Sequence, residues 1–147
     1  MRRFYKQAAA LFVLGAIMTP VWAHHSTAAY DFEKNLTLTG TVRTFRWTNP
    51  HNYLQLVVVG KDGVKREWAL EAGTPATATK MGWTKNTVKP GDRVTAVVAP
   101  MRDGSPAGSI KNLRLPNGQI LQSVAGDPKA SEVFKAIPRV NRVPEGK

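Results

Sequence analysis

The side chains best suited to chemistry in this sequence are its three histidines, His24, His25 and His51. A histidine at the start of a chain can bind one metal ion through both its α-amino group and its imidazole Nδ1, which closes a chelate ring. Such nitrogen-rich sites suit Cu(II) above the other common divalent ions. If residue 24 begins the mature chain, His24 and His25 therefore predict a copper site, with His51 as a third imidazole.

His51 follows Asn49-Pro50 in the expected connection between the first two strands, and in a small barrel this connection lies on the rim. The copper site requires the leader, residues 24–35, to run back to this rim. Extended at roughly 3.3 Å per residue, the segment from His25 to Leu36 spans about 36 Å, close to the length of the first strand. The leader is therefore just long enough.

Each histidine also has a purely structural interpretation. His24 and His25 can be the exposed start of a frayed terminus. His51 can cap the turn at Asn49-Pro50 or fill an edge of the core beside Trp47. The sequence leaves these interpretations open beside the metal site.

Other possible ligands lie near the histidines or are soft enough for Cu(I). Tyr30, Asp31 and Glu33 could ligate or orient a metal, although such a stretch is more typical of the approach to a strand. Met81 and Met101 could bind Cu(I), although single methionines usually serve packing. We leave all five out of the predicted site.

The aromatic side chains indicate a second class of function, a metal-free binding module for an envelope glycan or a partner protein. Small barrels of this size can stack planar ligands on exposed rings. Strand alternation turns Trp47 and Trp68 toward the core, so we expect Tyr53 and Trp83 to be exposed and to contact such a ligand.

Enzymatic interpretations have weaker support. Ser26 adjoins His25, but it lies in the leader without a glycine-rich elbow to present it as a nucleophile. Glu67 and Glu71 lie on one strand face about 13 Å apart, too far for a glycosidase pair. The sequence has no phosphate-binding loop, zinc-protease helix motif or dinucleotide fingerprint. We therefore expect no enzymatic activity.

The first 23 residues have the pattern of a secretion signal. Arg2, Arg3 and Lys6 form a basic start, and the apolar run over residues 8–18 is too short to span a bilayer. Val21-Trp22-Ala23 then resembles a signal-peptidase site, which predicts cleavage after Ala23 and a mature protein without a transmembrane segment. We expect the protein in the periplasm or secreted, by either the general or the twin-arginine route.

Cleavage leaves 124 of the 147 residues, enough for one domain with its own core. The mature formal charge is +8, because the signal carries three basic residues of the total of 21 and none of the ten acidic ones. Outside the cytoplasm such a surface attracts anionic lipid or polysaccharide, and we expect no nucleic-acid partner. The chain has no cysteine, which excludes disulfides, thiolate metal sites and thiol nucleophiles.

The mature chain reads as mostly β. Apolar residues alternate with polar ones in several short segments separated by turn signals, and the parity of the first segment flips in a way that indicates a bulge or sharp bend near Gly40 and Thr44. The expected elements are strands at residues 36–47, 54–58, 64–70, 94–98 and 110–115, a short sixth strand at 120–121, and a helix at 75–82.

Three strands, a short helix and two further strands, with a coiled first strand, are typical of a five-stranded OB-like barrel. A small β-sandwich is the alternative, although sandwiches rarely carry a helix between the third and fourth strands. We expect this domain to cover residues 24–125. Residues 126–147 are rich in proline and basic residues, and they predict a flexible, loosely attached tail.

Several short motifs occur together along the chain. The mature chain opens with His24-His25-Ser26, followed by Tyr30-Asp31, and later carries Trp47-Thr48-Asn49-Pro50-His51, Gly82-Trp83-Thr84 and Lys89-Pro90-Gly91-Asp92. In this combination, and in the stretch from Glu71 to Pro75, the sequence resembles a family of small exported bacterial proteins known only as a domain of unknown function. The resemblance covers most of residues 24–122 and implies an exported single domain, with no activity to carry over.

Overall fold

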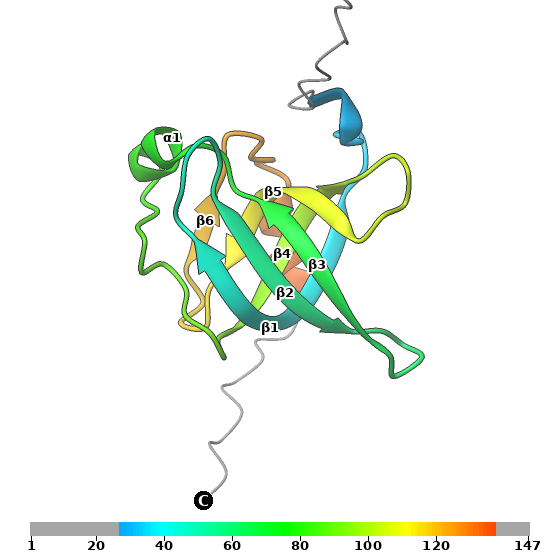
Figure 1. Cartoon of the computed structure of the whole chain (residues 1–147). Coiled ribbons are helices and arrows are strands. Elements are labelled where there is room, and N and C mark those ends of the chain that lie inside the picture. Colours follow the sequence, from blue (N-terminus) through cyan, green and yellow to red (C-terminus); the bar gives the residue numbers. More distant parts are fainter. Residues whose placement is uncertain (1–26, 138–147) are drawn as a thin grey trace, which may run out of the picture.

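The computed structural model describes residues 27–137 as a mostly β domain built around one closed barrel (Figure 1). The strands form a sheet in the order β3-β2-β1-β4-β5-β6, and a parallel pairing of β3 with β5 closes the first five into a barrel. This confirms the predicted OB-like architecture. The elements are η1 (Thr27–Ala29), β1 (Leu36–Arg46), β2 (Tyr53–Val59), β3 (Lys65–Glu71), α1 (Pro75–Lys80), β4 (Arg93–Pro100), β5 (Ala107–Arg114), β6 (Ile120–Gln122) and α2 (Ala130–Ala136).

The long first strand serves two neighbours because it bends. Its first half pairs with β4 and its second half with β2, and the register shifts between Val42 and Thr44. Gly40 permits the close approach of β1 to β2 at this bend, since a Cβ there would lie 2.5 Å from the carbonyl oxygen of Val57. The predicted bend near Gly40 and Thr44 is confirmed, and it is what allows five strands to close.

The core fills the barrel with aliphatic side chains from alternate strand positions. Its fully buried members include Leu54, Leu56, Leu70, Ile110 and Leu113. Trp47 and Trp68 pack against this cluster and are partly buried, as their inward parity predicts.

The exposure predicted for Trp83 is wrong. Only 1% of Trp83 is exposed, and its Nε1 donates a hydrogen bond of 2.6 Å to the carbonyl oxygen of Gln122. The Trp83 backbone N–H donates to the carbonyl of Ala78 at the end of α1, and its ring lies 6.2 Å from that of Phe45. The connection after α1 thus turns the indole inward, so Trp83 presents no stacking face to a ligand.

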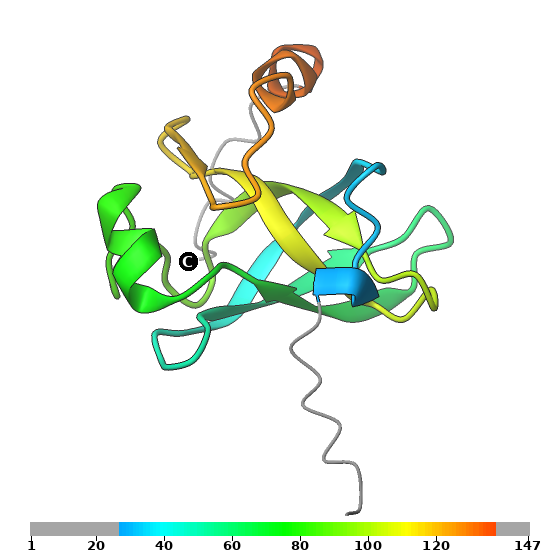
Figure 2. The same cartoon turned by 90° about the horizontal axis from the view of Figure 1, so that it is seen from above.

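The segment after residue 125 is not loose throughout. It contains α2, whose Phe134 is buried and packs against Val97 of β4 on the outside of the barrel (Figure 2). Arg114 of β5 donates hydrogen bonds to the carbonyl oxygens of Phe134 and Ile137 and stacks over the Phe134 ring. The predicted flexible tail is therefore wrong up to residue 137, while residues 138–147 lie outside the described residues.

The described residues begin at Thr27. The predicted signal peptide, residues 1–23, therefore lies outside them, and so do the two histidines that follow it, His24 and His25. Within residues 27–137 there is no helix with the length and apolar character needed to cross a membrane.

Candidate functional site

The histidine that the structure describes, His51, lies against an acidic side chain at one end of the barrel. Its Nδ1 is 3.1 Å from Oε1 of Glu71, the last residue of β3, and the two side chains are 22% and 18% exposed. A carboxylate beside Nδ1 favours the tautomer with the proton on that nitrogen. Nε2 is then the nitrogen that carries the lone pair a metal needs.

The backbone around His51 is fixed by its neighbour Asn52, which is completely buried. The Asn52 N–H donates to Gly73 O at 2.7 Å, and its carbonyl accepts from the Ala72 N–H at 2.9 Å, so the pairing of β2 with β3 continues into the loop. The Asn52 side chain accepts a hydrogen bond from the Thr48 N–H at 3.2 Å, and the Asn49-Pro50 peptide between them is cis. The loop therefore holds His51 in one place beside Glu71.

The other oxygen of the Glu71 carboxylate accepts a hydrogen bond from Tyr30. The Tyr30 hydroxyl donates to Oε2 at 2.9 Å, and burial together with this bond raises the pKa of Tyr30 well above its ordinary value. Tyr53 pairs with Glu71 across β2 and β3, and burial and the nearby carboxylate raise its pKa too. Both phenols therefore stay protonated at neutral pH, and the Glu71 carboxylate joins the leader to His51.

Tyr30 belongs to the leader, and two basic residues of the barrel fasten this segment. Beside Tyr30, the Arg102 N–H donates to Ala29 O at 2.9 Å and its Nε to Ala28 O at 3.1 Å, while the Asp31 N–H donates to Pro100 O at 2.8 Å. Figure 1 shows η1, at the start of this segment, at the same end of the barrel as the β1–β2 loop.

The second basic residue, Lys111, is only 5% exposed. Its Nζ donates to Phe32 O at 2.7 Å, to Lys34 O at 3.2 Å and to Asn35 Oδ1 at 2.6 Å. A buried ammonium is stable only with such acceptors around it, so Lys111 and the leader depend on each other. Together with Arg102 it fixes where the leader meets the rim.

The predicted site residues are brought together only in part. His51 lies on the rim as expected, and Tyr53 lies beside Glu71 with a partly buried side chain. Residues 27–137 hold no group of three or more histidine or acidic side chains placed to bind a metal. The contribution of Glu71 was missed. Along the sequence Glu71 stands out only as the partner of Glu67 on the same strand face, whereas its contact with His51 depends on how β2 and β3 pair.

No curated protein matches. Among solved structures, the chain is similar to the mitochondrial single-stranded DNA-binding protein Rim1 of S. cerevisiae, with 13% identity, a TM-score of 0.40, and coverage of 61% of this chain and 96% of that one. The sequence profile of a family of unknown function, DUF6152, matches residues 12–111, and the chain belongs to that family.

Proposed function

We propose that this protein is an exported domain that binds Cu(II) through the amino-terminal His24, His25 and the rim residue His51. One observation carries the proposal. The hydroxyl of Tyr30, a residue of the leader, is bonded to the same carboxylate that contacts His51. The chain therefore approaches His51 from its amino-terminal side.

The reach required of the leader supports the proposal. His24 and His25 precede Tyr30 by only a few residues, of which Thr27–Ala29 form the 3-10 helix η1. At roughly 2 Å per residue for η1 and roughly 3.3 Å per residue for an extended chain before it, the histidines could reach about 13–16 Å from Tyr30. Since Tyr30 is fastened next to Glu71, this length is ample to bring either histidine to His51. Tethering of this kind also raises the effective concentration of the terminal ligands at the rim.

The surroundings of His51 suit a metal ligand. Histidines that bind metals commonly carry a carboxylate on the second ring nitrogen, which orients the ring and raises its basicity. Glu71 stands in this position and is itself held by the Tyr30 hydroxyl. The terminal amine and two or three imidazoles then form the nitrogen-rich set that Cu(II) prefers.

Export is the second part of the proposal, and it rests on the basic start, short apolar run and small-residue cleavage pattern of residues 1–23. It is required for the copper site, because only cleavage after Ala23 gives His24 a free amine. Mass spectrometry of the protein recovered from the periplasm should find His24 as the first residue. A mature terminus at Met1 or Ala23 would contradict the proposed chelate.

The copper site is tested with three forms of the mature domain: the native form, one with an extra alanine before His24, and His51→Ala. The added alanine keeps every side chain but removes the chelate ring, so Cu(II) affinity in competition titrations should fall steeply. His51→Ala should remove one nitrogen from the EPR spectrum without unfolding the domain. Acid should release the metal, since the imidazoles and the amine must be unprotonated to bind.

Two results would reject the proposal. Equal affinity of the native and alanine-extended forms would exclude an amino-terminal chelate. If His51→Ala were also without effect, the histidines would have no part in binding, and the metal-free binding module would become the better interpretation.

A further inference from the structure

A groove runs over the outer face of the barrel, on strand positions not used by the histidine site. Its volume is about 380 Å³, within the range of small-ligand sites, about 300–1,000 Å³. It is lined by residues 39–43 of β1, Val57 and Val59 of β2, Lys65 of β3 and Arg93 of β4.

Strand register places the side chains that alternate with Gly40 and Val42 on one face together with their partners on the neighbouring strands. Thr41 pairs with Arg93 of β4 on one side and with Val57 of β2 on the other, and Val57 pairs with Glu67 of β3. Side chains of directly paired residues point to the same face of a sheet. The neighbouring position of β1, Val42, is buried in the core, so this row points outward.

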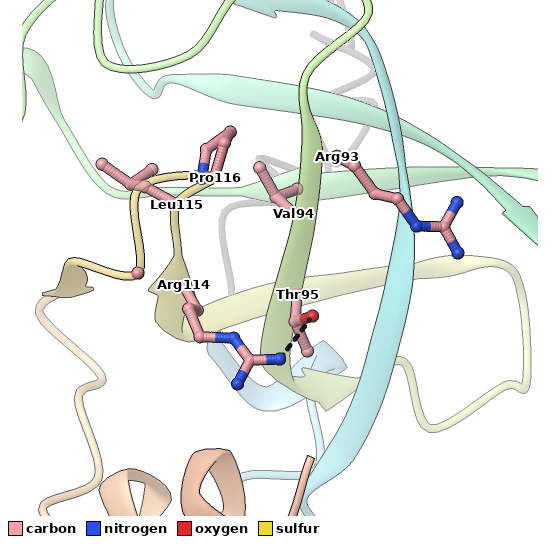
Figure 3. Close-up of a pocket in the computed structure, with 7 residues that line it drawn as sticks. Arg93, Val94, Thr95, Arg114, Leu115 and Pro116 are labelled. Atoms are coloured by element: carbon pink, nitrogen blue, oxygen red, sulfur yellow. Dashed lines mark hydrogen bonds between the residues drawn. The ribbon is translucent and has the colours of Figure 1, made fainter. Parts of the chain in front are cut away.

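The face is cationic and incompletely paired. Arg43 forms an ion pair with Glu67, which cancels both charges. Within residues 27–137, neither Lys65 nor Arg93 has an acidic partner, and the buried Nε of Arg93 has no hydrogen-bond acceptor. Figure 3 shows the Arg93 side chain leaving β4 away from Arg114 and extending across the cyan strand β1. Two cationic side chains without an acidic partner beside one groove point to a bound anionic group.

The other residues that line the groove limit the kind of molecule to which the anionic group can belong. Thr39 and Thr41 present hydroxyls, and Thr39 already exchanges one hydrogen bond of 3.0 Å with Thr95. Val57 and Val59 supply an apolar floor, and 55% of Val59 is exposed. Hydroxyls beside an apolar strip match the hydroxyl and C–H faces of a sugar ring. The groove lining includes no aromatic ring, which disfavours single-stranded nucleic acid because that ligand binds largely by stacking.

We infer that this groove binds an acidic saccharide, whose carboxylate groups pair with Arg93 and Lys65 while its sugar rings lie on Val57 and Val59. The guanidinium of Arg93 presents a planar fork of donors, which fits a carboxylate in two-point contact. This inference does not depend on the copper site, since His51 and Glu71 do not line the groove.

The test uses the mature domain and an oligogalacturonate as the probe, with binding measured by calorimetric titration. Arg93→Gln and Lys65→Gln should each weaken binding about tenfold, because each removes a charged hydrogen-bond donor. Lys85→Gln is the matched control, since it removes one exposed positive charge outside the groove. It should bind like the native domain, and so should His51→Ala. Lys65→Gln changes an exposed side chain, so it reports on binding even if Arg93→Gln unfolds the domain.

Further ligands separate this proposal from general attraction to a basic protein. A neutral oligosaccharide of equal length should not bind, and added salt should weaken the oligogalacturonate complex. The inference would be overturned by absence of binding or by an equal loss in Lys85→Gln. Tighter binding of a single-stranded oligonucleotide, or of vesicles rich in anionic lipid, would assign the groove to another class of partner and would equally reject the saccharide.

Discussion

Trp83→Ala separates a structural role from a ligand-binding role for the largest fully buried side chain of the domain. The substitution removes an indole that is 1% exposed, its contact with Phe45 and its 2.6 Å hydrogen bond to Gln122 O. Removing a tryptophan of this kind from a core costs about 3–5 kcal/mol. A domain of this size has about 5–15 kcal/mol of stability in total, so the loss is a large fraction of it.

The effect is measured by chemical denaturation followed by circular dichroism, with a thermal scan beside it. The expected loss corresponds to a fall in Tm on the order of 10–20 °C. Trp83→Phe keeps an aromatic ring but leaves Gln122 O without its donor, so it should cost less, about 1–3 kcal/mol. Val124→Ala changes a side chain that is 64% exposed and serves as the baseline, within about 0.5 kcal/mol of the native domain.

One pattern of results would refute this reasoning. If Trp83→Ala lost less than about 1 kcal/mol, the indole could not be packed in the core. If it then also weakened the binding of a saccharide, the original assignment of Trp83 as a contact residue would be correct and the buried position wrong.

Three further predictions concern the leader, the β2–β3 hairpin and α2. Lys111→Met removes the donor that holds the leader, so amide exchange at Asp31 should rise while exchange in the barrel strands stays slow, as seen by mass spectrometry. The pKa of Asp62 lies at about 2, mainly because of its hydrogen bond from Arg66. A pKa that is lowered by folding adds stability that is present above about pH 4 and is lost as the pH falls toward about 2. In Asp62→Asn, the free energy of unfolding should therefore change less with pH between about 4 and 2 than in the native domain. Phe134→Ala should release α2 and make it susceptible to limited proteolysis, with the barrel still folded.

The strands and their closure could be predicted because they follow local patterns. Alternating apolar residues give each strand, Gly40 gives the bend, and Pro75 gives the start of the helix. Trp83 could not be placed this way, because it lies in a connection where no periodicity assigns an inward face. The same holds for α2, whose few apolar residues, Val133 and Phe134, stand among charged ones.

The candidate site was predicted in its residue types and missed in its contacts. His51 on the rim follows from the turn at Asn49-Pro50. The pairing of His51 with Glu71 depends on the register of β2 and β3, and the bond from Tyr30 depends on where the leader meets the closed barrel. Neither is encoded in the spacing of residues along the chain, since both arise only when distant segments fold together.

The attachment of the leader has a consequence for the order in which the domain can be assembled. Its acceptors at Phe32 and Ala28 are bonded by Lys111 and Arg102, which lie 79 and 74 residues further along the chain. Contacts between such distant residues carry a larger loop-closure entropy than the hairpins do, so we expect them to form after the nearer strand pairs have shortened the loop. Residues 28–35 are therefore expected to be among the last parts of the described chain to take their places. A metal site that joins His51 to the amino-terminal histidines would therefore be completed only after β4 and β5 are in place, whereas the chelate ring of His24 itself needs no folded barrel.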